Sequence, residues 1–133
     1  MGKTFKTVPN ILLIDDDTII AMIVEEMLKN KFKVDKCTNG VDALHHIALC
    51  DYPLIITDIN MPFLNGIDLI NFINQSKIDS KFILLSSSIE QYRETILQNV
   101  IAKFGKPFDA LEFVKTVHNF FSQELYGNSN TSG

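Results

Sequence analysis

Carboxylates, a hydroxyl and an ammonium follow apolar runs of the sequence at four separate places. Three consecutive aspartates, residues 15–17, follow one run, and Asp58 ends a second. Ser86 ends a third run, and Lys106 stands before Pro107 after a fourth. If these runs are parallel strands of one sheet, their carboxyl ends share one edge, where open α/β sheets bind ligands. We therefore expect these polar side chains to converge on one site.

The chemistry of such a site follows from its charges. Crowded carboxylates repel one another, which raises their pKa values or attracts a cation. A set of oxygen ligands without His or Cys favours Mg²⁺ over zinc. A divalent cation, a lysine and a hydroxyl together suit a phosphoryl group, because its transfer depends mainly on positioning and charge neutralisation. One carboxylate is then left to act as the nucleophile.

Each of these features has a plainer interpretation when it is taken alone. Asp17 stands where a helix N-cap is expected, residues 86–88 suit an ordinary turn, and Lys106 suits a solvated charge. Four such features at the ends of neighbouring strands favour a functional site over four coincidences.

The apolar runs have the composition of buried strands. Four of them are rich in Ile and Leu and apolar on both faces, as in parallel strands covered by helices on both sides. These are residues 11–14, 54–57, 82–85 and, with a weaker pattern, 101–104. A fifth run, residues 32–36, alternates apolar and polar side chains like an edge strand.

Apolar residues recur at helical spacing between and after these runs. The five segments are residues 20–28, 41–48, 67–73, 89–100 and 111–121. This alternation predicts an α/β fold, a flavodoxin-like doubly wound (βα)5 sandwich, because parallel strands need crossover connections. A five-stranded parallel sheet of order 2-1-3-4-5 is the best match.

Length and composition bound the function classes. The 133 residues suit one domain, and the net charge of −4 makes it a poor nucleic-acid binder. No apolar run reaches the roughly 18 residues of a membrane span, and no signal core is present, so we expect a cytoplasmic protein. Cys37 and Cys50 match no metal-site spacing and are expected to be free thiols. We expect the domain over residues 10–122, an N-terminal extension over 1–9, and a disordered tail or residues introduced by cloning over 123–133.

These motifs resemble those of response-regulator receiver domains, the phosphoacceptor modules of two-component phosphorelay signalling. The resemblance covers residues 10–121 and keeps the order, spacing and strand context of the motifs. The matching residues are Asp15-Asp16, then Asp58 with Met61-Pro62 and Asn65-Gly66 beyond it, then Ser86, and then Lys106-Pro107-Phe108.

The resemblance implies a phosphoacceptor and a magnesium site. Asp58 would attack phosphorus in line. Asp16 would be a direct Mg²⁺ ligand, together with Asp58 and the backbone carbonyl of Asn60. Asp15 would act on the metal through a bound water.

The resemblance also implies partners and an output. Ser86 would bind a phosphoryl oxygen, and Lys106 would pair with the phosphoryl charge. A histidine kinase or a histidine phosphotransfer protein would be the donor. The domain would assist its own phosphorylation and dephosphorylation without being an enzyme. A downstream effector would contact the face formed by the helix of 89–100, the strand of 101–104 and the helix of 111–121.

Two positions depart from the family pattern. Ser87 stands where Ala is most frequent, and Lys103 stands where receivers usually carry Tyr or Phe. Because lysine keeps its ammonium in water, we expect Lys103 to stay exposed on the output face, within reach of an acidic partner. We also expect a cis peptide at Lys106–Pro107, since cis bonds belong almost wholly to X-Pro.

Two other functions are consistent with parts of the sequence. In a haloacid-dehalogenase-like phosphatase, Asp15 would be the nucleophile, because residues 15–18 resemble that family's first motif. That family needs a further strand with acidic ligands after the lysine, and it leaves the motif around Asp58 unexplained. A receiver-like binding module that is never phosphorylated is the other alternative, although such modules usually lose an acidic or lysine position that this chain keeps.

Overall fold

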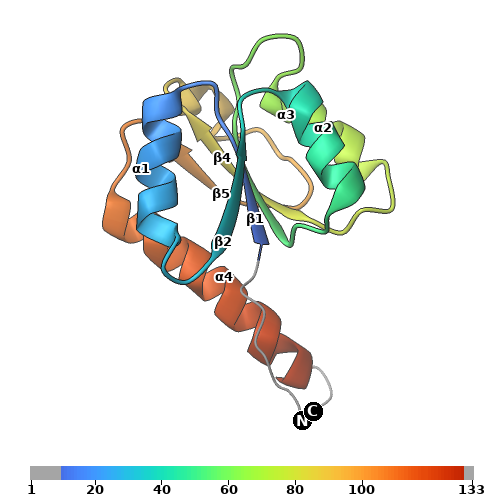
Figure 1. Ribbon diagram of the computed structural model, residues 1–133, viewed down its shortest axis with the longest axis vertical. Coiled ribbons are helices and arrows are strands. Elements are labelled where there is room, and N and C mark those ends of the chain that lie inside the picture. Colours follow the sequence, from blue (N-terminus) through green and yellow to red (C-terminus); the bar gives the residue numbers. More distant parts are fainter. Residues whose placement is uncertain (1–9, 131–133) are drawn as a thin grey trace.

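Five parallel strands form a single sheet that lies between two layers of helices (Figure 1). The computed structural model describes residues 10–130, so the segments 1–9 and 131–133, including the predicted N-terminal extension, lie outside the described residues. The spatial order β2-β1-β3-β4-β5 is the one predicted from sequence. The strands are β1 (Asn10–Ile14), β2 (Lys33–Cys37), β3 (Leu54–Asp58), β4 (Lys81–Ser86) and β5 (Val100–Gly105).

Two helices pack on each face of the sheet. Helices α1 (Thr18–Leu28) and α4 (Ala110–Asn130) cover one face, where Val24, Phe113 and Val117 are buried. Helices α2 (Gly40–Leu49) and α3 (Gly66–Asn74) cover the other, where Ala43 and Leu69 are buried. The sheet therefore separates two apolar cores, which explains why its central strands are apolar on both faces.

The central strands are buried along almost their whole length. All five residues of β3 are buried, and so are four of the five in β1. Strand β2 lies at the edge and has only Cys37 buried, in agreement with its alternating sequence. Because β1 and β3 are neighbours, the residues that follow them meet at one edge of the sheet.

Side-chain caps fix the starts of α1, α2 and α3, and Asp109 accepts from the Glu112 N–H at the start of α4. The carboxylate of Asp17 accepts hydrogen bonds from the backbone N–H groups of Ile19 and Ile20, at 3.0 and 3.2 Å. Asn39 and Asn65 cap α2 and α3 in the same way. Asp17 is therefore the N-cap of α1, and its carboxylate is directed at the helix rather than at its acidic neighbours.

The predicted helix over residues 89–100 is wrong. Within the described chain this segment contains only the 3-10 turn η1 (Ile89–Tyr92), and Val100 already belongs to β5. The β-branched pair Thr95 and Ile96 disfavours a helix. Ile96 is 95% exposed, so it does not belong to a buried apolar stripe as the helical spacing predicted.

The last helix is longer than predicted. Helix α4 continues to Asn130, into the segment 123–133 for which a disordered tail was expected. Gln123, Glu124 and Leu125 have high helix propensity, so the helix continues through them and into the Gly, Asn and Ser residues that follow, although these residues disfavour a helix.

Among the described residues, no helix combines the length and the apolar character needed to span a membrane.

Gly66 allows α3 to start directly against the end of β3. Its backbone N–H donates to the carbonyl of Ile59 at 2.9 Å. A Cβ at this position would lie 2.3 Å from the backbone carbonyl oxygen of Asp58, and backbone cannot move aside as a side chain can. The absence of a side chain therefore lets the chain turn back beside Asp58.

We expect Gly66→Ala to lower the free energy of unfolding by about 1–3 kcal/mol, the usual cost of overpacking. Gly105→Ala is the matched control, because the one tight contact of its Cβ would be the Ile89 Cγ2 methyl, at 3.0 Å, and that side chain can adjust. Urea unfolding of both variants checks the prediction. Equal losses for the two variants would contradict it.

Candidate functional site

The predicted convergence of carboxylates is confirmed. Asp15 directly follows β1, and Asp58 is the last residue of β3. Both are buried, whereas Asp16 is exposed at the mouth of the site. One carboxylate oxygen from each of the three residues lies within 4.8 Å of the others. Neighbouring parallel strands thus bring three acidic groups to one point at the edge of the sheet.

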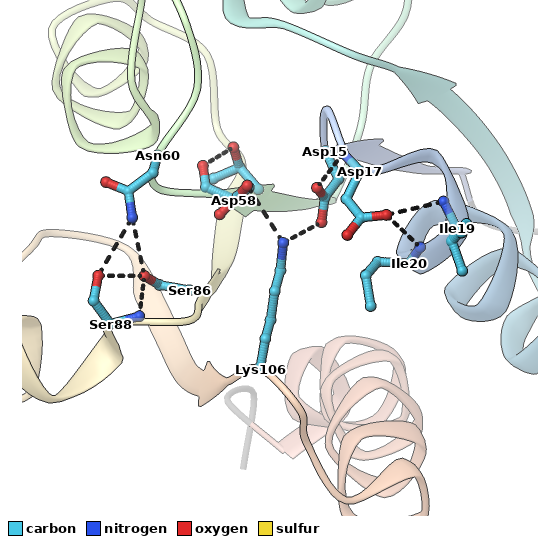
Figure 2. Close-up of polar contacts among 10 residues, drawn as sticks. Asp15, Asp17, Ile19, Ile20, Asp58, Asn60, Ser86, Ser88 and Lys106 are labelled. Atoms are coloured by element: carbon cyan, nitrogen blue, oxygen red, sulfur yellow. Dashed lines mark hydrogen bonds and ion pairs between the residues drawn. The ribbon is translucent and has the colours of Figure 1, made fainter.

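Lys106 extends its ammonium between two of these carboxylates (Figure 2). Its Nζ lies 2.8 Å from Asp15 Oδ2 and 3.3 Å from Asp58 Oδ2, and only 13% of its side chain is exposed. The residue follows β5, and the predicted cis peptide at Lys106–Pro107 is present. The lysine therefore compensates charge from β1 and β3 at the same time.

Asp15 is held at both carboxylate oxygens. Its Oδ1 accepts a hydrogen bond from the backbone N–H of Asp17 at 2.9 Å. Its Oδ2 is fully buried and forms an ion pair with Lys106. Within the described chain, this contact does not have the angles of a well-directed hydrogen bond. The Asp17 N–H and the Lys106 ammonium thus engage both oxygens of Asp15.

This charge balance shifts two pKa values. Burial raises the pKa of the Asp58 carboxyl to about 6, and the charge of Asp15 adds to the effect, while Lys106 opposes it. Burial disfavours the charged form of Lys106, but its contacts with Asp15 and Asp58 outweigh this and raise its pKa. Lys106 therefore stays protonated, and Asp58 holds a proton more readily than an exposed aspartate does.

Ser86 belongs to a separate polar cluster beside the carboxylates. Its Oγ accepts from the backbone N–H of Ser88 at 3.0 Å and lies 3.2 Å from Ser88 Oγ. The side-chain amide of Asn60 donates to both hydroxyls, at 3.4 and 3.3 Å (Figure 2). Sequence reasoning missed Ser88 and the side-chain amide of Asn60 as neighbours of Ser86. The run of three serines is the only signal for this cluster, and it suits an ordinary turn equally well.

The expectation that Lys103 stays exposed and free for an acidic partner is wrong. The side chain is half-buried, and its ammonium donates to the backbone carbonyls of Tyr92, Arg93 and Thr95. The physical reason lies in the missing helix. Because these carbonyls are not committed to an α-helical ladder, they can accept from the ammonium, which offers three donors.

The donor set fits a hard divalent cation. Three carboxylates supply oxygen ligands within reach of one another, and in the described part of the chain Lys106 alone forms ion pairs with them. Mg²⁺ prefers such oxygen ligands and tolerates water in the remaining positions. The exposed position of Asp16 leaves the cluster open to solvent on one side.

Comparison with known proteins agrees with this geometry. The model of the response regulator receiver domain family matches residues 11–118. The cell cycle transcriptional regulator CtrA of Caulobacter vibrioides is 32% identical over 111 residues, which are 81% of this chain and 48% of that protein. The probable transcriptional regulator ycf29 of Porphyra purpurea is 25% identical over 126 residues, 91% of this chain and 60% of that protein. The chain thus spans about half the length of the curated relatives it matches.

Solved structures of similar fold are also receivers. The receiver domain of the Francisella response regulator 1452 has a TM-score of 0.78 and 28% identity, with 87% of this chain and 98% of that chain covered. The response regulator TrrA of Thermotoga maritima, in complex with Mg²⁺-BeF, has a TM-score of 0.76 and 29% identity, with 84% and 98% covered. Fold, site and family match lead to one conclusion: this chain belongs to the family of response regulator receiver domains.

Proposed function

We propose that this domain accepts a phosphoryl group on Asp58 in the presence of Mg²⁺, in the cytoplasm, from a histidine kinase or a histidine phosphotransfer protein. The observation that carries the proposal is the buried Asp58 carboxylate beside two further carboxylates and the Lys106 ammonium. Phosphorylation then changes the surface formed by η1, β5 and α4, which a downstream effector contacts.

Asp58 suits the nucleophile better than Asp15 does. Both oxygens of Asp15 are engaged, one by the Asp17 N–H and one by Lys106. For the Asp58 carboxylate, the polar contacts with described side chains involve Oδ2 alone, which lies 3.3 Å from Lys106 Nζ. A carboxylate with a free oxygen at an open site attacks phosphorus more readily, which argues against a phosphatase that uses Asp15.

The metal would be held by Asp16 and Asp58 directly, by the Asn60 carbonyl, and by Asp15 through a water. When bound, Mg²⁺ neutralises the carboxylates and the phosphoryl oxygens. Asp16 has the exposure that an entering hydrated ion requires. The related TrrA structure contains Mg²⁺-BeF, which supports this assignment by similarity.

Lys106 and Ser86 would receive the phosphoryl oxygens. The ammonium already lies beside Asp58 and stays charged, because its pKa is raised. It pairs with the phosphoryl charge as the new P–O bond forms and the bond from phosphorus to the donor breaks. The Ser86 hydroxyl lies in the neighbouring cluster with Asn60 and needs to turn toward Asp58. The domain thereby assists its own phosphorylation as a signalling module.

Asp58→Asn should abolish labelling by acetyl phosphate and leave the fold intact, because an amide is nearly isosteric but a much poorer nucleophile. Lys106→Met should reduce labelling without abolishing it, since the acceptor remains. Labelling is measured by intact-protein mass spectrometry, with Asp79→Asn, an exposed carboxylate in another part of the domain, as the control. Undiminished labelling of Asp58→Asn would move the acceptor elsewhere, with Asp15 as the first candidate.

Asp16→Asn should weaken Mg²⁺ binding by roughly tenfold or more, because it removes a charged ligand. Asp17→Asn is the matched control, since the carboxylate of Asp17 is already bonded to the N–H groups of Ile19 and Ile20. In an amide NMR titration, the signals of Asp15, Asp16, Asp58 and Asn60 should move first. Equal weakening in both variants, or shifts confined to other acidic residues, would overturn the assignment.

The raised pKa of Asp58 also predicts a pH-dependent stability in metal-free buffer. The carboxyl titrates at about 6 in the folded protein against 3.8 in an unperturbed chain, so the folded state binds the proton more tightly. The resulting stabilisation is complete below pH 3.8 and is lost as pH rises through 6. At pH 7, Asp58→Asn should therefore be more stable than the parent by about 1–3 kcal/mol.

Urea unfolding in EDTA between pH 4 and 7 measures this difference. The gain of Asp58→Asn should shrink as pH falls toward 4, whereas the effect of the control Asp79→Asn should vary little with pH. A gain that stays constant over this range would show that Asp58 carries no raised pKa.

A further inference from the structure

Lys103 of β5 contacts the segment 92–95, which lies where a helix over residues 89–100 was predicted. Lys103 Nζ lies 2.8 Å from the Tyr92 carbonyl oxygen, 3.2 Å from that of Arg93 and 2.6 Å from that of Thr95. In a helix these carbonyls would accept from backbone N–H groups four residues ahead. Here a single ammonium uses all three of its donors on them, and bonds from a charged donor are stronger than neutral ones.

The position of Lys103 in the sheet explains this reach. Lys103 pairs with Leu84 of β4. It lies two residues before Gly105, so the Lys103 side chain and a Cβ at Gly105 would be on the same face of the sheet. Ile89 of η1 packs on Gly105, since a Cβ there would lie 3.0 Å from Ile89 Cγ2. The lysine stem therefore crosses the face that η1 covers and meets the end of that turn.

The other end of the segment is fixed independently. Asn99 has a positive φ of 70° and donates from Nδ2 to Asn74 Oδ1 of α3 at 2.8 Å. Lys81 of β4 donates to Asn99 Oδ1 at 2.9 Å, and Asn74 donates to the Gln98 carbonyl at 2.8 Å. Residues 93–99 are therefore attached at both ends, by Lys103 at the start and by this amide network at the finish.

The turn η1, which precedes residues 93–99, is also connected to the proposed phosphorylation site. Ser88 immediately precedes η1, and its backbone N–H donates to Ser86 Oγ. If Ser86 is to contact a phosphoryl group on Asp58, it must reorganise its contacts with Ser88 and Asn60. The beginning of η1 then moves, while Lys103 holds its end.

We propose that Lys103 and the carbonyls of Tyr92, Arg93 and Thr95 form a clasp that stabilises the unphosphorylated conformation and opposes phosphoryl binding at Asp58. The opposition rests on the function proposed above, whereas the ordering of residues 93–99 does not. Because coupling between two sites is reciprocal, breaking the clasp strengthens phosphoryl binding, and phosphorylation weakens the clasp. Lys103 is then a positioning residue that lowers the affinity of the domain for a phosphoryl group at Asp58.

The test compares Lys103→Met, which keeps the apolar stem and removes the donors, with Lys103→Arg, which keeps charge and donors. Lys115→Met, an exposed lysine of α4, is the control. Amide exchange is measured without ligand at Thr95 and Val100, whose N–H groups bond within the segment to the Tyr92 and Leu97 carbonyls. Beryllofluoride with Mg²⁺ then serves as the phosphoryl probe, titrated by NMR.

We expect Lys103→Met to exchange about tenfold faster at Thr95 and to bind beryllofluoride several-fold more tightly, as expected for loss of charge-assisted bonds. Lys103→Arg and Lys115→Met should stay close to the parent. Unchanged exchange in Lys103→Met would overturn the clasp, and unchanged or weaker beryllofluoride binding would overturn its opposition to phosphorylation. If the parent itself does not bind beryllofluoride, the proposed function fails, and the ligand-free exchange still decides whether the clasp exists.

Discussion

The ammonium of Lys106 lies between the carboxylates of Asp15 and Asp58, and the arrangement of the whole site depends on this contact. At such distances the Coulomb attraction of each ion pair is about 5–6 kcal/mol at an effective dielectric constant of 20, before desolvation is subtracted. Losing Lys106 would leave Asp15 buried without its counter-charge, and such a loss typically costs about 3–5 kcal/mol. With Asp16 also present, three carboxylates share one lysine, and burial together with Asp15 keeps the pKa of Asp58 high. The site therefore has an electrostatic need for a cation.

The sheet makes this unfavourable grouping possible. Strands β1 and β3 are neighbours in register, with Ile14 beside Thr57, so their ends cannot separate without breaking the sheet. The apolar residues of both strands are buried on two faces, and their burial stabilises the fold far more than one crowded site destabilises it. The cap at Asp17 and the close turn at Gly66 then hold the loops that surround Asp58.

Sequence reasoning predicted the parts of the molecule that depend on regular patterns. Runs such as residues 11–14 and 54–57 have one stable location, the centre of a parallel sheet, and this sets the strand order and the edge where Asp15, Asp58 and Lys106 meet. Family resemblance added roles for these residues, which the geometry supports.

The parts that sequence reasoning missed depend on single side-chain contacts. Residues 89–100 carry a helical apolar spacing, but the Lys103 ammonium of β5 bonds to three carbonyls of this segment, and no local pattern reveals such a contact. The contacts of Asn60 with Ser86 and Ser88 are of the same kind, because Asn60 follows β3 whereas the two serines lie at and just after the end of β4. The length of α4 is a different case, because the Gly, Asn and Ser near the end of the sequence disfavour a helix, whereas residues 123–125 favour one.

One lysine does not neutralise the acidic cluster, and the function proposed for Asp58 depends on this residual negative charge. The most direct test is a carbon-13 NMR titration of the Asp58 carboxyl in metal-free protein, repeated with saturating Mg²⁺. We expect a pKa of about 6 without metal, and a clear fall when the cation is bound. An ordinary aspartate pKa without metal, or a value that Mg²⁺ does not change, would contradict the account.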